Sequence, residues 1–275
     1  MPELPQVNVG LLAHALERFL AEELRACGLA GYVVGLSGGI DSAVSAALAV
    51  RALGRGKVRA LAIPGSSSNP ESLVHGRLVA EALGIDLEVV ELGEAATSLA
   101  RLLGADSDRV RYGNVLARLR MITLFDRARR APSLVLGTSN KSEILLGYST
   151  MFGDSAASVQ PLGDIWKTHV FALARHLDVP EVVVTKPPSA DLWPGQTDSA
   201  EMGFDYLEAD PVLYWHHERG MDRDALCAAG FPLALVNGVV RTYRANRFKW
   251  RPTVVARVSA SCVNVDRILP RNPGR

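Results

Sequence analysis

A glycine-rich stretch constrains this chain more than any other feature of its sequence. Residues 35–50, GLSGGIDSAVSAALAV, contain two adjacent glycines flanked by hydroxyl side chains and a carboxylate, followed by a run of small and apolar residues. Glycines let the backbone approach a phosphate closely, and the N-terminus of a helix presents free N–H groups to an anion. The stretch therefore predicts a phosphate-binding loop between a strand and a helix.

Strand-like and helix-like segments alternate around this loop, from residue 30 to residue 150. Such alternation predicts a doubly wound α/β fold, a parallel sheet with helices on both faces. Ligands of these sheets bind at the carboxyl ends of the strands, where the loop lies. From residue periodicity we expect strands at 32–36, 57–65, 86–92 and 133–137, and helices at 7–27, 43–53, 70–84 and 113–130.

The second half of the chain is predicted to be mostly helical. We expect helices at about 164–178, 204–218 and 222–246. Residues 186–203 hold three prolines and two glycines between them and are predicted to form a long loop, a length typical of functional lids. No break in composition marks a second domain, so residues 1–275 are interpreted as one domain with a loose tail at 270–275.

Charge and composition argue against several function classes. The net charge of +1 gives no broad basic surface for nucleic acid or acidic membrane. No apolar run approaches the roughly 20 residues of a membrane helix, and the N-terminus lacks the pattern of a signal peptide. The three cysteines, Cys27, Cys227 and Cys262, form no CxxC pair, so we expect free thiols in a reducing cytoplasm.

Asp41 distinguishes the loop from that of the P-loop kinases, which read GxxxxGK[ST]. No lysine follows the glycines here, and a carboxylate repels phosphates unless a cation lies between them. We therefore assign Asp41 to Mg²⁺ that bridges phosphate oxygens, with Ser37 and Ser42 as hydroxyl donors. The alternative is a tight glycine turn in which Asp41 only caps the helix.

The full string SGGIDSA resembles the pyrophosphate-loop signature of the adenine nucleotide α hydrolases, which have a Rossmann-like fold. Members of that superfamily hold pyrophosphate as the leaving group and transfer AMP to an acceptor. Four further stretches resemble the NAD synthetase family in order and spacing, and the resemblance runs from about residue 7 to residue 250. They are NVLARLRMITLF, LVLGTSNKSEILLGYSTMFGDSA, PLGDIWKTHVFALARHL and KPPSADLWPGQTDSAEMGFDY.

This resemblance implies a ligase that forms a carbon–nitrogen bond. ATP, deamido-NAD and ammonia would give NAD, AMP and pyrophosphate through an adenylated carboxylate, the last step of NAD biosynthesis. It also implies a homodimer with Mg²⁺ at the ATP site. Helices 7–27 and 111–130 are reasonable interface elements, because both look apolar over wide faces. A separate glutaminase chain remains open as the source of ammonia.

The resemblance also assigns roles to individual residues. Asp41, Glu143 and Lys167 would be catalytic, with Asp41 and Glu143 as the magnesium ligands, and residues 186–203 would form the lid. Arg118 and Lys249 would bind deamido-NAD. ATP would contact Gly35, Leu36, Ser37, Gly38, Gly39, Ile40, Asp41, Ser42, Thr138, Lys167 and Ser189.

Local patterns offer a second interpretation of some of these residues. Glu143 lies three residues after Asn140, which is the spacing of a helix capping box. If Asp164 caps the next helix, Lys167 lies in its first turn, where a cation opposes the helix dipole unless an anion is near. These patterns leave a purely structural role open for Glu143 and favour a nearby phosphate for Lys167.

Arg118 and Arg120 lie on different faces of the helix predicted at 113–130. With Val115, Leu119 and Ile122 as the buried stripe, Arg118 is about 60° from its centre and borders a cleft. Arg120 is then predicted on the far side. The helix pattern therefore favours Arg118 as the arginine that binds substrate.

Three positions depart from the pattern of bacterial ammonia-using members. Met151 and Ser158 stand where that pattern has a lysine and an aspartate, and Phe248 replaces a histidine beside Lys249. The dinucleotide pocket is therefore expected to differ in detail. Two rival functions also stay open: another ATP-pyrophosphatase that amidates a different acceptor, and a nucleotide-binding regulatory module without turnover.

Overall fold

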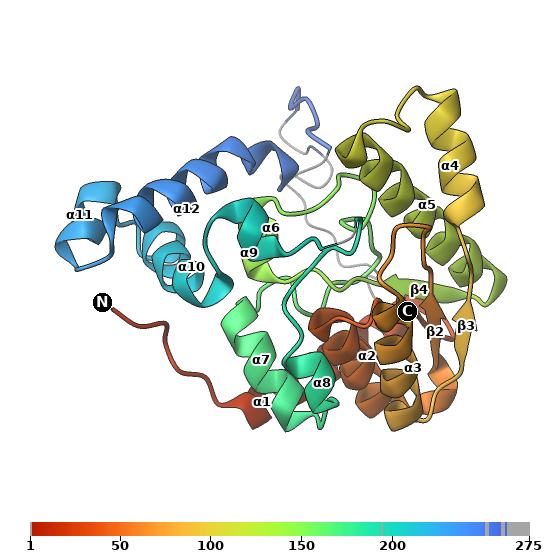
Figure 1. Cartoon of the computed structure of the whole chain (residues 1–275). Coiled ribbons are helices and arrows are strands. Elements are labelled where there is room, and N and C mark those ends of the chain that lie inside the picture. Colours follow the sequence, from red (N-terminus) through yellow and green to blue (C-terminus); the bar gives the residue numbers. More distant parts are fainter. Residues whose placement is uncertain (1, 194, 251–252, 260–261, 263–275) are drawn as a thin grey trace.

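The computed structural model describes residues 2–193, 195–250, 253–259 and 262, so the tail predicted at 270–275 lies outside the described residues. Four parallel strands form one sheet in the order β3-β2-β1-β4 (Figure 1). This confirms the predicted parallel sheet. The strands are β1 (Gly31–Gly35), β2 (Val58–Ala62), β3 (Leu87–Val89) and β4 (Ser133–Leu136).

Helices cover both faces of the sheet, because alternate residues of a strand point to opposite sides. Tyr32 and Val34 of β1 pack with α1 (Val9–Cys27), α2 (Ile40–Leu53) and α7 (Lys167–His176). Val33 packs on the other face, in a cluster that includes Ala128 of α5 (Arg109–Arg130). The doubly wound arrangement is therefore confirmed.

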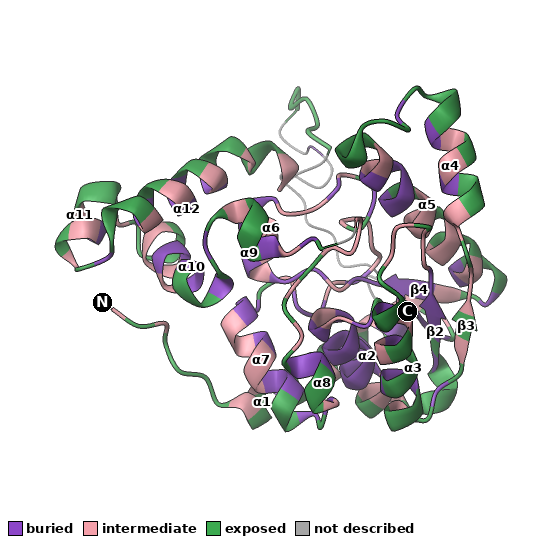
Figure 2. Ribbon diagram, in the orientation of Figure 1, coloured by how far each residue is buried: buried purple, intermediate pink, exposed green. Residues whose placement is uncertain are grey.

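The small residues of α2 explain why the segment after the glycine-rich loop packs so closely. Every residue from Ser42 to Ala49 is buried, and α2 contacts β1, β2, α1 and α7. Figure 2 shows α2 as the most continuously buried helix in this view. Such packing places the start of α2, and the loop before it, at the carboxyl end of the central strand β1.

A second cluster of helices lies beside the sheet, at the left of Figure 1. Its core contains Trp166, Phe204, Leu213, Phe231 and Val239, all buried. It is built by α6 (Lys141–Leu146), α10 (Tyr206–Leu213), α11 (Arg223–Ala228) and α12 (Leu233–Ala245). The remaining helices are α3 (Pro70–Leu83), α4 (Gly93–Leu102), α8 (Glu181–Val184) and α9 (Asp198–Met202), with short turns at Arg55–Lys57, Tyr214–Glu218 and Arg247–Lys249.

Several predicted helix boundaries were wrong. The helix predicted at 222–246 is broken into α11 and α12, because Gly230 adopts a positive φ of 95° and Pro232 precedes α12. The helix predicted at 204–218 begins at Tyr206 and changes to a π-helical turn at Tyr214. The helix predicted from residue 43 begins at Ile40, and α4 was not predicted at all.

The described residues contain no helix that is both long and apolar enough to cross a membrane. In the part of the chain that the structure describes, Cys27 and Cys227 are half-buried and form no disulfide.

Candidate active site

The first of the two adjacent glycines in the loop adopts a backbone conformation that only glycine tolerates well. Gly38 has a φ of +73°, and a Cβ atom there would lie 2.2 Å from the carbonyl oxygen of Ser72. At Gly39, with φ −99°, a Cβ would meet only the Ser37 hydroxyl, at 3.3 Å. Gly38 is therefore required by the fold, because α3 packs directly against the loop, whereas at Gly39 only the Ser37 hydroxyl would have to shift.

Hydroxyl groups hold this loop in shape. The Ser42 hydroxyl donates to the carbonyl of Gly39 (2.9 Å), and the backbone N–H of Ser37 donates to Ser42 (3.2 Å). The Ser37 hydroxyl accepts from the N–H of Gly39 (3.3 Å). Gly39 caps α2 without a side-chain hydrogen bond, so the helix N-terminus faces outward for an anion.

Asp41, Glu143 and Lys167 meet at one point, although they are far apart in the sequence. The Lys167 ammonium donates to Asp41 Oδ2 (2.5 Å) and to Glu143 Oε1 (3.2 Å). Only 2% of the Lys167 side chain is exposed, against 18% for Asp41 and 16% for Glu143. The structure thus brings together the three residues that the sequence analysis named as catalytic.

Burial shifts the pKa of two of these groups. Burial and the nearby Asp41 raise the pKa of Glu143 from 4.5 to about 8, although Lys167 opposes the shift. Burial alone would lower the pKa of Lys167, but Asp41 and Glu143 outweigh it and raise that pKa above its ordinary value. Lys167 therefore remains a cation in contact with both carboxyl groups.

Asn140 positions both carboxylates, a role that the sequence analysis missed. Its amide donates to Asp41 Oδ1 (2.9 Å), and its side-chain oxygen accepts from the N–H of Glu143 (3.0 Å). Glu143 in turn accepts from the N–H of Asn140, which completes a capping box. The spacing of Asn140 and Glu143 signalled the cap, but nothing local signalled the bond to Asp41.

Lys167 is the first residue of α7, but Asp164 does not cap this helix. Trp166 is the N-cap of α7, and Asp164 is exposed and paired with Lys141 (2.7 Å). The prediction of a helix from 164 was therefore wrong. Asp41 and Glu143 supply the negative charge that the sequence analysis expected from a phosphate.

Asp210 fixes the start of α7 and was also missed, since a carboxylate inside a predicted helix gives no local signal. It is fully buried and accepts from the backbone N–H (2.8 Å) and hydroxyl (2.7 Å) of Thr168. It also accepts from the Ser142 hydroxyl (2.5 Å), which itself accepts from the N–H of Lys167 (2.9 Å). Burial raises the pKa of Asp210, and its donors oppose that shift. This network ties α6, α7 and α10 together around Lys167.

The lid segment, defined as residues 186–203, lies against the loop that follows β2. Asp191 accepts from the backbone N–H of Asn69 (2.9 Å), and the Ser67 hydroxyl donates to the carbonyl of Leu192 (2.8 Å). Leu192 and Trp193 help to line a cavity of about 510 Å³ between this loop, α4 and the start of α5. The segment is irregular as predicted, except for α9 near its end.

Thr138, Ser189 and Lys249 are less directly placed than the central cluster. Thr138 follows β4 and is half-buried, and Ser189 is exposed and accepts from the N–H of Asp191 (3.1 Å). Lys249 donates to the backbone carbonyls of Gly147 (2.7 Å) and Ser149 (2.9 Å). Among the described residues, no ion pair or side-chain hydrogen bond joins these three to Asp41, Glu143 or Lys167.

The predicted orientation of the two arginines on α5 was wrong. Arg118 is exposed and donates to the carbonyl of Asn114 (3.3 Å) on its own helix. Arg120 points inward, donating to the carbonyl of Ile63 (3.0 Å) and to Ser68 (3.0 Å), and burial lowers its pKa. The buried face of α5 is formed by Val115, Leu116 and Ala117, and Ile122 is 56% exposed, so the stripe assumed for this helix was misplaced.

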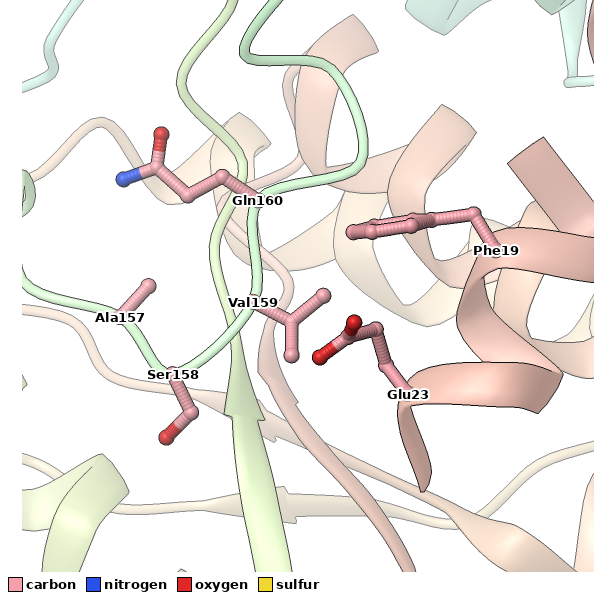
Figure 3. Close-up of a pocket in the computed structure, with 6 residues that line it drawn as sticks. All are labelled: Phe19, Glu23, Ala157, Ser158, Val159 and Gln160. Carbon is pink, nitrogen blue, oxygen red and sulfur yellow. The ribbon is translucent and has the colours of Figure 1, made fainter. Parts of the chain in front are cut away.

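The three positions that depart from the family pattern have different surroundings. Ser158 donates its N–H to the carbonyl of Val135 (2.9 Å) beside β4, and Phe248 is 62% exposed. Met151 is half-buried in a turn. Ser158 also lines a pocket of about 340 Å³ in which Phe19 and Glu23 of α1 face residues 157–160 (Figure 3).

The chemistry of the site fits a magnesium ion. Carboxylate oxygens are its usual protein ligands, and one or two of them normally suffice because phosphates and waters complete the octahedron. Asp41 and Glu143 provide two, and the Lys167 ammonium already lies between them. Among the described residues no group of three or more His, Cys, Asp or Glu side chains could hold a metal, so phosphate and water would supply the other ligands.

Comparisons with known proteins agree with this geometry. The family model described as NAD synthase matches residues 12–253. An NH₃-dependent NAD⁺ synthetase of Chlorobaculum tepidum is 45% identical over 265 residues, which cover 96% of this chain and 95% of that protein. Similar solved structures include two that each match nearly their full length to this chain.

One of these structures is an NMN synthetase from Francisella tularensis, with a TM-score of 0.79, 31% identity, and coverage of 91% of this chain and 99% of that one. The other is an NH₃-dependent NAD synthetase from Campylobacter jejuni in complex with the nitrate ion. It has a TM-score of 0.76 and 29% identity, and covers 92% of this chain and 100% of that one.

Proposed function

This chain belongs to the NAD synthase family, and from that premise we propose that it amidates deamido-NAD with ammonia and ATP to give NAD, AMP and pyrophosphate. It is thus a ligase that forms a carbon–nitrogen bond. The observation that carries the proposal is the meeting of Asp41, Glu143 and Lys167 at the glycine-rich loop, in a chain 45% identical to an NH₃-dependent NAD⁺ synthetase.

The reaction requires an activated carboxylate. The carboxylate of deamido-NAD resists attack by ammonia, because it is anionic and oxide is a poor leaving group. Transfer of AMP from ATP cancels the charge and supplies a good leaving group. The protein must therefore stabilise negative charge first on the departing pyrophosphate and then on the tetrahedral intermediate formed with ammonia.

The loop and Lys167 would perform the first of these tasks, which is to stabilise the departing pyrophosphate. The backbone around Gly38 and Gly39, the hydroxyls of Ser37 and Ser42 and the N-terminus of α2 would hold the pyrophosphate part of ATP. Lys167 would turn its ammonium toward the phosphates as charge develops there. Mg²⁺ held by Asp41 and Glu143 would neutralise phosphate charge when bound.

The remaining predicted contacts belong to this proposal as well. Thr138 and Ser189 would contact ATP, and Arg118 and Lys249 would contact deamido-NAD. Arg118 is exposed on α5, so it would meet the substrate at the molecular surface or across a homodimer contact. The lid would exclude water that would otherwise hydrolyse the adenylate.

The test is a complete assay with purified protein, ATP, Mg²⁺, deamido-NAD and ammonium, in which NAD and AMP are both measured. We expect NAD and AMP in equal amounts. Replacing Lys167 with Met should lower turnover more than about 100-fold, since a preorganised charge at the leaving group is lost. Lys141→Met is the matched control, because Lys141 pairs with Asp164 and Glu218 outside the cluster.

A second acceptor follows from the structural comparison. Because one similar structure is that of an NMN synthetase, nicotinic acid mononucleotide should be tested beside deamido-NAD. A higher kcat/KM for the mononucleotide would reassign the substrate but keep the chemistry. Absence of AMP with every acceptor would refute the ligase and favour a nucleotide-binding module, and turnover with glutamine alone would refute the dependence on ammonia.

A further inference from the structure

Asp198 is a buried carboxylate of the lid segment to which the reaction so far gives no role. It is 4% exposed and lies at the start of α9. Its backbone N–H donates to the carbonyl of Pro188, which closes the lid segment on itself (3.0 Å). A carboxylate so deeply buried requires a compensating partner.

That partner is Lys167, reached through one tyrosine. The Tyr206 hydroxyl donates to Asp198 Oδ2 (3.0 Å), and the Tyr206 ring faces the Lys167 ammonium, which lies 5.1 Å from the ring centre. An ammonium over an aromatic face is attracted to the ring. Asp198, Tyr206 and Lys167 therefore form a continuous chain from the lid to the catalytic cluster.

The cluster gathers three carboxyl groups around one lysine. Asp41, Glu143 and Asp198 all favour the charged form of Lys167. A divalent cation held by Asp41 and Glu143 would compete for the two carboxyl groups that Lys167 now contacts. Lys167 would then lose ion-pair partners while it remains only 1% exposed.

We propose that Asp198 is a positioning residue for Lys167. It holds the ammonium, through the Tyr206 ring and by its own charge, at the phosphates once Asp41 and Glu143 bind the metal. This inference rests on the function proposed above. It adds that the lid contributes a charge to the nucleotide site in addition to excluding water.

Asp198→Asn tests this with nearly unchanged shape. We expect kcat to fall roughly 10- to 100-fold while KM for ATP changes less than about threefold, the pattern of an interaction that matters only in the transition state. Calorimetry gives a second measurement: ATP binding should need about fivefold more Mg²⁺, because a nearby negative charge is lost. Asp191→Asn is the matched control, since Asp191 is a lid carboxylate that contacts Asn69 instead.

Tyr206→Phe keeps the ring over Lys167 but removes the hydroxyl that donates to Asp198. We expect kcat to fall about three- to tenfold, and the double variant to be no worse than Asp198→Asn alone, because both changes break one chain. If Asp198→Asn does not fold, the Tyr206→Phe result decides, and a wild-type kcat there would overturn the proposal.

The outcomes separate the two claims. If the wild-type protein makes no NAD, the proposed function fails. If it does, and Asp198→Asn keeps the wild-type kcat and Mg²⁺ requirement, the positioning role fails. A raised KM with unchanged kcat would also refute that role, because it would show that Asp198 only orders the lid.

Discussion

At the scale of single residues, the structural and the functional interpretations of this site hold together. Glu143 forms the capping box that its spacing from Asn140 predicts, and its other carboxylate oxygen accepts from Lys167. The cap at the start of α6 thus also orients a carboxyl group that we propose to be catalytic. A capping pattern in a sequence therefore does not argue against function, since a fixed helix N-terminus also fixes the side chain.

The raised pKa of Glu143 makes stability depend on pH. The pKa of this carboxyl group is about 8 in the folded protein, against an ordinary value of 4.5. Folding therefore favours the protonated form. The stability that this adds is full below pH 4.5 and is lost as pH rises through about 8. Lys167 stays charged throughout that range.

We therefore expect the Tm of the metal-free wild-type protein to fall between pH 5 and pH 9. This fall should exceed that of Glu143→Gln by roughly 5 °C, because the amide cannot ionise. Thermal unfolding monitored by circular dichroism at several pH values measures this. Parallel curves for the two proteins would show that Glu143 titrates normally.

At the scale of elements, close packing decides which glycine of the loop is structural. A Cβ at Gly38 would lie 2.2 Å from the carbonyl oxygen of Ser72 in α3, whereas a Cβ at Gly39 would approach only the Ser37 hydroxyl. Tertiary contact between the loop and α3 thus separates two neighbours that the sequence presents as equivalent.

Gly38→Ala should destabilise the fold by about 2 kcal/mol or more and abolish ATP binding, because it combines a positive φ with a backbone clash. Gly39→Ala should keep the wild-type unfolding midpoint and weaken ATP binding only, since its methyl group would face the phosphates. Urea unfolding and calorimetric ATP titration give the two readouts. Equal loss of stability in both variants would contradict this division.

At the scale of the whole molecule, α5 leaves apolar side chains at the surface. Ile122 is 56% exposed and Phe125 is 38% exposed on α5, and Phe19 of α1 is 38% exposed beside the pocket of Figure 3. Isolated apolar residues at a surface are ordinary, but these lie on the two helices that the sequence suggested as interface elements.

We expect the protein to form a homodimer through this surface. Ile122→Asp should shift sedimentation equilibrium toward the monomer, because a buried unpaired charge opposes association. Leu102→Asp is the control, since Leu102 of α4 is 82% exposed on another helix. A wild-type protein that sediments as a monomer at micromolar concentration would contradict the dimer.

Local signals in the sequence determined the class of the fold and the centre of the site. Alternating strands and helices predicted the parallel sheet, because each segment carries its own periodicity. The SGGIDSA loop identified Asp41 through its chemistry. The family motifs identified Glu143 and Lys167, residues that the sequence alone does not place near Asp41.

Only the tertiary structure decided which groups share a buried space. It turned Arg120 rather than Arg118 inward, because α5 buries Leu116 and Ala117 beside Val115 and leaves Ile122 exposed. It placed Asn140, Asp198 and Asp210 around Asp41, Glu143 and Lys167, although no local pattern marks two of them. These roles depend on contacts between residues distant in the chain, and periodicity carries no information about such contacts.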